Sequence, residues 1–307
     1  MKIYYLLLKI SLVCISLVLS SVITTCSQKK DSALNSGDPV SAFVSIAPQA
    51  YIVERIGGTS VSVHTLVDKG QEPHTFQYTP HQLMELTKAE LFFKIGMPFE
   101  RELVSKLQQN NANLRVIEST EGIEFRIMQN SHHDEEHGEE HKNDVEMDPH
   151  VWLGVAQLRL IAENIFNALK ETLPEQEEYF KRNMTLFLKD LDEIHMKLSE
   201  ILKPYKGRTV FVFHPAFGYF TDTYNLIQEA IEIEGKSPLP KQLKKFIEKA
   251  REEEVSIIFV QKQFDTKSSE TIAEAINGVV IPLDPLSKDI LRNFEDIAGN
   301  IEKALKK

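Results

Sequence analysis

The sequence predicts an α/β protein with two lobes, each containing a roughly four-stranded parallel sheet flanked by helices, joined by one long rigid helix. The length of 307 residues suits two domains. Short apolar runs rich in β-branched residues alternate with helical stretches, a pattern typical of parallel βα units. A long segment near the middle of the chain keeps an apolar stripe at helical spacing.

The predicted strands divide evenly between the two halves of the chain. The first half contains apolar runs at residues 42–47, 61–67, 91–95 and 114–118. The second half contains runs at residues 209–213, 230–233, 256–260 and 279–283. Four strands in each half predict one lobe at residues 41–170 and another at residues 205–307.

The segment between the halves predicts a linker helix at residues 171–204. Its apolar residues are alternately four and three positions apart, so they share one helix face: Phe180, Met184, Phe187, Leu191, Ile194, Leu198 and Ile201. About 29 residues at roughly 1.5 Å each give a rod of about 40 Å, long enough to run along both lobes. We expect the stripe to pack on the protein's own lobes, with a coiled coil to a partner as the alternative, and His195 to be a surface or packing histidine.

The N-terminus predicts export. Residues 1–25 combine early lysines with an apolar run and small residues, which is the pattern of a signal peptide. The small residues end at Cys26, in a sequence that resembles a bacterial lipobox, although Thr25 is unusual before the cysteine. Residues 26–40 are polar and predict a flexible tether. We therefore expect a periplasmic or cell-surface lipoprotein attached to the membrane only through Cys26, the alternative being cleavage nearby and a free protein.

Composition excludes several kinds of site. Both cysteines, Cys14 and Cys26, lie in the N-terminal segment, so the folded lobes can contain no disulfide, cysteine-ligated zinc, iron–sulfur cluster or cysteine nucleophile. With 35 basic and 45 acidic residues, the net charge of −10 argues against a nucleic-acid partner and favours small cations.

A histidine- and acid-rich loop is predicted at residues 129–148. It contains His132, His133, His137 and His141 among acidic residues, with no apolar residue between them. Such a stretch cannot bury a core and predicts a solvated loop. Dense imidazole and carboxylate groups also bind divalent metals loosely, so these histidines are predicted to form weak auxiliary metal sites.

Three other histidines predict a metal site between the lobes. His74, His150 and His214 each adjoin a proline, which fixes one backbone torsion beside the side chain. His74 and His214 follow predicted strands, as does Asp284, and ligands of α/β proteins gather beyond the carboxyl ends of strands. Three imidazoles and one carboxylate suit tetrahedral Zn²⁺. Taken singly, each histidine is equally compatible with an ordinary polar role at a domain edge.

Four motifs in order resemble one protein family. They are Glu72-Pro73-His74, the run Asp148-Pro149-His150-Val151-Trp152-Leu153, the run His214-Pro215-Ala216-Phe217-Gly218-Tyr219-Phe220, and Leu283-Asp284-Pro285-Leu286. Together, around a long central helix, they resemble the zinc-binding solute-binding proteins of bacterial zinc ABC transporters, in the family 9 or cluster A-I superfamily. The resemblance covers the chain from about residue 40 to its end.

The resemblance implies a monomer that captures Zn²⁺ between two α/β lobes and delivers it to a membrane permease. It implies His74, His150, His214 and Asp284 as the metal ligands. Glu72 is not expected to bind the metal, because Pro73 occupies the position directly before His74. Manganese members generally have a carboxylate at the position of His214, and imidazole there favours zinc. Because imidazoles must be neutral to bind a metal, we expect affinity to fall as the pH drops through about 6.5.

Other functions remain open at this point. A manganese- or iron-binding member of the same superfamily, serving as a transporter component or an adhesin, is the first alternative. A zinc hydrolase is another, since three histidines and an open position also describe catalytic zinc. No general acid or base stands out in the motifs, so we expect a binding protein rather than an enzyme.

Overall fold

The computed structural model describes residues 38–110, 114–128, 147–231, 240–261 and 266–306. The predicted signal peptide, Cys26 and most of the tether lie outside these residues. The four loop histidines, His132, His133, His137 and His141, also lie outside them. From Pro39 onward the chain forms one compact unit.

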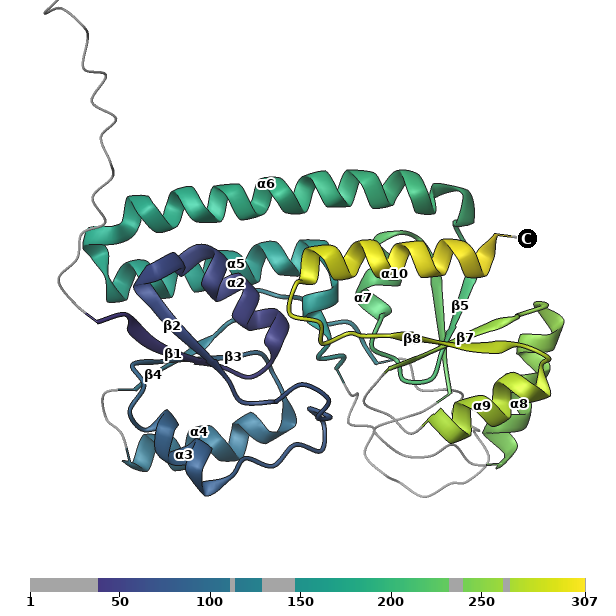
Figure 1. Ribbon diagram of the computed structural model, residues 1–307, viewed down its shortest axis with the longest axis horizontal. Helices are drawn as coiled ribbons and strands as arrows, with labels where there is room; N and C mark the ends of the chain where they lie inside the picture. Colours follow the sequence, from purple (N-terminus) through teal and green to yellow (C-terminus); the bar gives the residue numbers. More distant parts are fainter. Residues whose placement is uncertain (1–37, 111–113, 129–146, 232–239, 262–265, 307) are drawn as a thin grey trace, which may run out of the picture. The chain divides into compact units, whose positions relative to one another are not determined.

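The first sheet has four parallel strands in the order β2-β1-β3-β4. In Figure 1, α2 and α5 lie over one face of this sheet, and α3 and α4 lie on the other. The strands are β1 (Val40–Val44), β2 (Val61–Thr65), β3 (Leu91–Lys94) and β4 (Arg115–Glu118), and the helices are α2 (Ala47–Gly57), α3 (Pro80–Leu86), α4 (Pro98–Asn110) and α5 (Val155–Thr172).

The second sheet repeats this arrangement, with parallel strands in the order β6-β5-β7-β8. Its strands are β5 (Thr209–Val212), β6 (Ile227–Ala230), β7 (Ile257–Gln261) and β8 (Val279–Leu283), and its helices are α7 (Gly218–Thr223), α8 (Pro240–Glu252), α9 (Thr266–Ala275) and α10 (Ile290–Leu305). The predicted fold class, with four parallel strands in each half of the chain, is confirmed.

The strand expected at residues 230–233 instead occupies Ile227–Ala230. Pairing with β5 sets this register, because Thr209 lies opposite Ile227 and Val212 lies opposite Ala230. One residue further, the backbone N–H of Ile231 donates to the carbonyl of Phe213 at 3.3 Å, and residues 232 and 233 of the expected strand lie outside the described residues.

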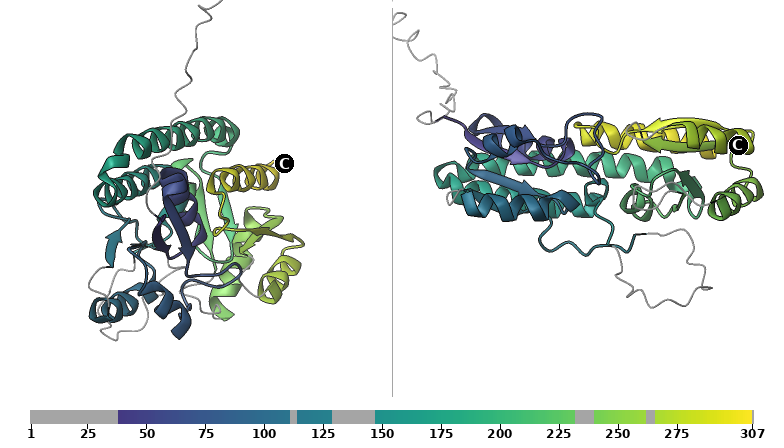
Figure 2. Two further views of the ribbon diagram at one scale, coloured as in Figure 1. Left: turned by 60° about the vertical axis from the view of Figure 1, so that its left-hand side comes forward. Right: turned by 90° about the horizontal axis from the view of Figure 1, so that it is seen from below.

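The long helix α6 spans Glu177–Leu202 and runs alongside helices of both lobes (Figures 1 and 2). It packs on α2 and α5 of the first lobe and on α10 of the second. Its buried residues are Phe180, Phe187, Leu191, Leu198 and Leu202. The protein's own helices cover the apolar stripe, as expected. The 26 residues of α6 make a rod about 39 Å long.

The linker helix begins later than residue 171. Residues up to Thr172 belong to α5, and a 3-10 turn at Pro174–Gln176 separates the two helices. Pro174 begins that turn because its fixed φ suits the first helical position. The imidazole of His195 lies 3.4 Å from the hydroxyl of Tyr224, a packing contact between α6 and the second lobe.

Two hydrophobic clusters make the core. The larger one continues from the first sheet through α5, α6 and α10 to the near face of the second sheet. The smaller one lies on the other face of the second sheet, where Phe211 stacks edge-on against Phe246 of α8. Among the described residues, no helix is both long enough and apolar enough to cross a bilayer.

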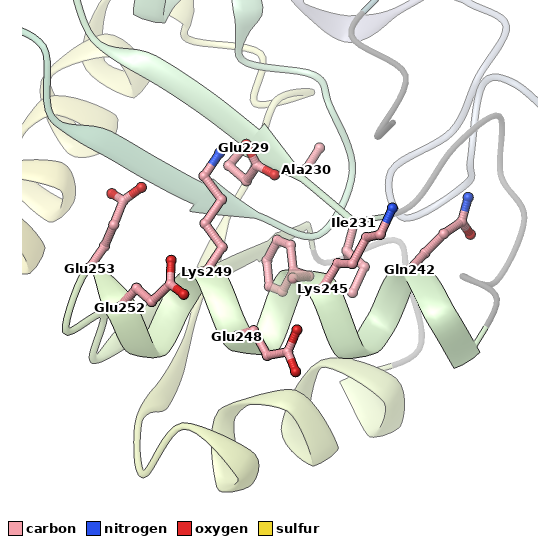
Figure 3. Close-up of a pocket in the computed structure, with 10 residues that line it drawn as sticks. Glu229, Ala230, Ile231, Gln242, Lys245, Glu248, Lys249, Glu252 and Glu253 are labelled. Carbon is pink, nitrogen blue, oxygen red and sulfur yellow. Dashed lines mark hydrogen bonds and ion pairs between the residues drawn. The ribbon is translucent and has the colours of Figure 1, made fainter. Parts of the chain in front are cut away.

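A hollow of about 480 Å³ lies between β6 and α8 (Figure 3). Its floor is apolar, with Phe246 and Ile231, and its rim carries charges of both signs. Lys249 pairs with Glu229 across it at 2.5 Å. None of the three predicted histidine ligands lines this hollow, and we assign no metal to it.

Candidate metal centre

His74 lies on a connection that is anchored at both ends. The connection leaves β2 at Leu66, whose backbone carbonyl accepts a hydrogen bond from the Gln82 side chain of α3 at 2.8 Å. Two residues after His74, the ring of Phe76 packs edge-on against Phe99 of α4, with centroids 4.9 Å apart. These contacts hold a segment that has no regular secondary structure, and they leave the imidazole of His74 mostly buried.

His150 is held by its own neighbours. It precedes a 3-10 turn at Val151–Leu153 and is 3% exposed. Its ring Nδ1 lies 2.7 Å from Oδ1 of Asp148, and the same oxygen accepts the backbone N–H of His150 at 3.0 Å. We assign the imidazole proton to Nδ1, because an ionised carboxylate can only accept. The other ring nitrogen, Nε2, is therefore the one that can bind a metal.

His214 comes two residues after β5, at the centre of the second sheet. The strand is continued by a hydrogen bond from the backbone N–H of Phe213 to the carbonyl of Phe259. The side chain of Gln261, at the end of β7, donates to the carbonyl of His214 at 3.2 Å. His214 is 3% exposed, so its imidazole is fixed within the protein rather than placed on the surface.

The three Nε2 atoms converge. Those of His74 and His214 lie 3.1 Å and 3.2 Å from that of His150. Tetrahedral zinc with nitrogen ligands at about 2.05 Å would separate them by roughly 3.3 Å. Within the described part of the chain, this is the one group of three or more metal-binding side chains whose ligand atoms all lie within 4.8 Å of one another. The two Nε2–Nε2 spacings are therefore close to those of a tetrahedral zinc site.

The cavity beside these atoms has a volume of about 10 Å³. That is about the volume needed by one water-sized sphere, so the cavity suits a single ion rather than an organic molecule. Gln261 also lines it, and the buried Oε1 of this side chain has no hydrogen-bond partner among the described residues.

The electrostatics keep His74 neutral and place a carboxylate behind His150. Burial, followed by repulsion from His150 and His214, lowers the pKa of His74 to about 2. Burial opposes ionisation of Asp148, but hydrogen bonds from His150 and Arg126 outweigh it and lower the pKa of this carboxyl. The imidazole of His74 therefore stays neutral well below pH 6.5, so its protonation does not oppose metal binding near that pH.

The structure places the two candidate carboxylates, Asp284 and Glu72, differently. Asp284 does not join the histidine group, and its Oδ1 accepts the backbone N–H of Leu286 at 3.0 Å. Glu72, which is not among the predicted ligands, lines the cavity. Its Oε1 lies 3.9 Å from Nε2 of His74 and accepts the backbone N–H of the same residue at 3.1 Å.

Sequence reasoning misses two further residues. Asp148 belongs to the Asp-Pro-His motif, but the motif alone gives it no role. Its spacing is a usable signal, because a short acidic side chain two positions before a histidine can reach that residue's backbone. Arg126, which donates to Asp148 at 2.9 Å, lies far from any recognised motif.

Comparison with known proteins identifies the family. The family described as "Zinc-uptake complex component A periplasmic" (ZnuA) matches residues 43–306. The chain belongs to this family. A crystal structure of ZnuA superposes with a TM-score of 0.79 at 37% identity, covering 87% of this chain and 99% of that one. A zinc-bound ZnuA lacking its residues 138–173 superposes with a TM-score of 0.78 at 36% identity, covering 87% and 98% of the two chains.

Curated relatives include a manganese protein and a protein whose metal is not named. A manganese ABC transporter substrate-binding lipoprotein of Streptococcus mitis is 26% identical over 270 residues, or 83% of this chain and 82% of its own. A candidate metal-binding protein of Chlamydia trachomatis is 29% identical over 269 residues, or 85% and 92% of the two chains. The protein is thus a metal-binding solute-binding component of ABC transport and not an enzyme, which excludes the hydrolase alternative.

Acid should destabilise the metal-free protein through His74. The unfolded chain takes up a proton on this imidazole near pH 6.5, whereas the folded protein does so only near pH 2. Between these values the unfolded state binds more protons. The free energy of unfolding should therefore fall with decreasing pH, by up to about 1.4 kcal/mol per pH unit for this group. Urea unfolding with a chelator between about pH 6.5 and pH 5 measures the slope.

His74→Asn should make this slope shallower, because the variant lacks the titrating group. His64→Asn is the matched control, since it removes an exposed histidine of β2 in the same lobe. Equal slopes for wild type and His74→Asn would contradict the assignment.

Proposed function

We propose that the protein captures Zn²⁺ outside the cytoplasm with His74, His150 and His214 and delivers it to the permease of an ABC importer. One observation carries the proposal: three Nε2 atoms meet 3.1 Å and 3.2 Å apart beside an ion-sized cavity. The ligands come from both lobes, so a bound ion would join them. Membership in a metal-uptake family supports delivery of the ion to a membrane permease.

The donor set supports zinc over manganese. Three imidazoles suit zinc, whereas manganese and other oxygen-seeking ions prefer carboxylate, carbonyl and water ligands. One similar structure, a ZnuA at 36% identity, has zinc bound. The manganese relatives are more distant, at about 26% identity. We therefore assign zinc as the transported ion.

The long helix supports a small rearrangement on binding. Because α6 packs on α2 and α5 of one lobe and on α10 of the other, a wide hinge opening would expose its buried face. Metal-free and metal-bound forms should differ through adjustments of the loops that carry the ligands.

Zinc binding should depend on all three histidines. Changing His74, His150 or His214 singly to Ala should lower zinc affinity on the order of 100-fold or more, since even partners behind a ligand contribute 10- to 100-fold. His214→Asp should also shift the preference from zinc toward manganese, because it replaces imidazole by carboxylate. Competitive titration of each variant with both metals measures these effects.

His64→Ala serves as the control and should bind zinc as the wild type does. If manganese outcompetes zinc on the wild-type protein, or if the three variants bind like the control, the proposed function is wrong.

For the fourth ligand we propose Glu72 rather than Asp284. Glu72 lines the cavity, and a small rotation would bring its carboxylate from 3.9 Å toward the ion beside His74. Glu72→Gln should therefore weaken zinc binding by about 10-fold or more, and Asp284→Asn should have little effect. The same competitive titration decides between them. The reverse order of effects would establish Asp284, the ligand implied by family resemblance.

For localisation we propose export with removal of residues 1–25 and lipid attachment at Cys26. Relatives such as the Streptococcus mitis protein support this, since they are lipoproteins. Wild-type protein expressed in a bacterium should incorporate labelled fatty acid and remain with the membrane fraction. Cys26→Ser should be released in soluble form, and equal membrane association of both proteins would argue against the anchor.

A further inference from the structure

A chain of charged contacts lies behind the metal ligand His150. The side chain of Asp148 is fully buried and uses both oxygens. Oδ1 accepts from His150, and Oδ2 accepts from Nη1 of Arg126 at 2.9 Å. A buried carboxylate of this kind needs its cationic partner, because removing the partner leaves an uncompensated buried charge.

Arg126 continues this chain into the second lobe. Its Nε donates to Oδ2 of Asp222 on α7 at 2.9 Å, and its guanidinium lies 5.8 Å from the ring centre of Tyr219 on the same helix. The Tyr219 hydroxyl accepts the backbone N–H of Arg126 at 3.1 Å and donates to the Asp148 carbonyl at 2.9 Å. The side chain of Arg126 and the backbones of Arg126 and Asp148 are therefore all hydrogen-bonded to α7.

The start of α7 is shaped to admit the guanidinium. A Cβ at Gly218 would lie 1.5 Å from Nη1 of Arg126, so any other residue would displace it. Gly218 follows His214 by four positions, in the same connection after β5. The segment from His214 to Gly218 thus supplies both a proposed metal ligand and the space that the Arg126 guanidinium occupies.

We propose that Arg126 is a positioning residue that couples α7 to Asp148 and so places His150 against His214 before the ion binds. This inference rests on the proposed zinc site. His150 and His214 come from different lobes, and the metal would join them only once it is bound. Hydrogen bonds link Asp222 to Arg126, Arg126 to Asp148, and Asp148 to His150. They hold the segment of His150 against the segment of His214 without the metal, so less conformational entropy is lost when the ion binds.

The test measures zinc affinity by chelator competition and site geometry by the absorption spectrum of the cobalt(II)-substituted protein. Arg126→Met should lower zinc affinity about 10- to 100-fold and weaken or shift the cobalt bands. Arg126→Lys should recover part of the affinity, since one ammonium group can reach one carboxylate but cannot bridge both. Asp222→Asn should lower zinc affinity about three- to ten-fold, because it weakens only the contact between Arg126 and α7.

Arg55→Met is the matched control. Arg55 makes a similar half-buried ion pair with Asp190, at 2.7 Å, between α2 and α6. This variant should keep zinc affinity within about two-fold of wild type, together with the wild-type cobalt spectrum.

Wild-type affinity and an unchanged cobalt spectrum in Arg126→Met would overturn the inference. If Arg126→Met does not fold, Arg126→Lys and Asp222→Asn decide, and wild-type binding by both would overturn it equally. Failure of the zinc site itself has a different signature. In that case His214→Ala, in an otherwise wild-type chain, would keep the cobalt bands.

Discussion

The hydrogen bond between His150 and the buried Asp148 is the interaction on which the metal site depends. A neutral imidazole can present either ring nitrogen, and this bond leaves Nε2 facing the cavity. It also places a negative charge directly behind the ligand, which raises the basicity of the imidazole. Hydrogen bonds from His150 and from Arg126 together lower the pKa of this fully buried carboxyl and keep it ionised. The middle member of the histidine group is therefore oriented without help from an ion.

The fold brings the other two histidines to this point. Both sheets are parallel, with the same strand order, and His214 follows the central strand β5. His74 lies further from its strand and is positioned by contacts of its connection with α3 and α4. The helix α6 contacts helices of both lobes and so limits their separation. The packing of both lobes on α6 thus brings Nε2 of His74 and Nε2 of His214 to 3.1 Å and 3.2 Å from Nε2 of His150.

Sequence periodicity predicts the long helix well because one face of that helix is buried. The stripe on α6 has its seven apolar residues at helical spacing, and the structure covers this face with three helices. Element ends were less predictable, since they depend on pairing. The strand β6 ends at Ala230 where β5 ends, although the apolar run continues in the sequence. The start of α6 likewise depends on a 3-10 turn that periodicity cannot distinguish from helix.

That the three histidines lie together could be predicted, because proline and strand ends mark rigid positions. Where the nearby carboxylates point could not be predicted, because it depends on local hydrogen bonds to the backbone. Asp284, like His214, follows a strand and precedes a proline, yet its Oδ1 accepts the backbone N–H of Leu286 two residues later. Glu72 makes a similar local bond, but its longer side chain still lines the cavity. Arg126 lies beside Asp148 and Asp222 only in the folded chain, 22 and 96 positions away in the sequence, so no local pattern reveals it.

Anomalous diffraction at the zinc edge, from crystals of the zinc-loaded protein, tests the central claim most directly. We predict one strong peak within about 2.1 Å of Nε2 of His74, His150 and His214, with Nδ1 of His150 still bonded to Asp148. A peak elsewhere, or zinc bound to Nδ1 of His150 with Asp148 turned away, would contradict it.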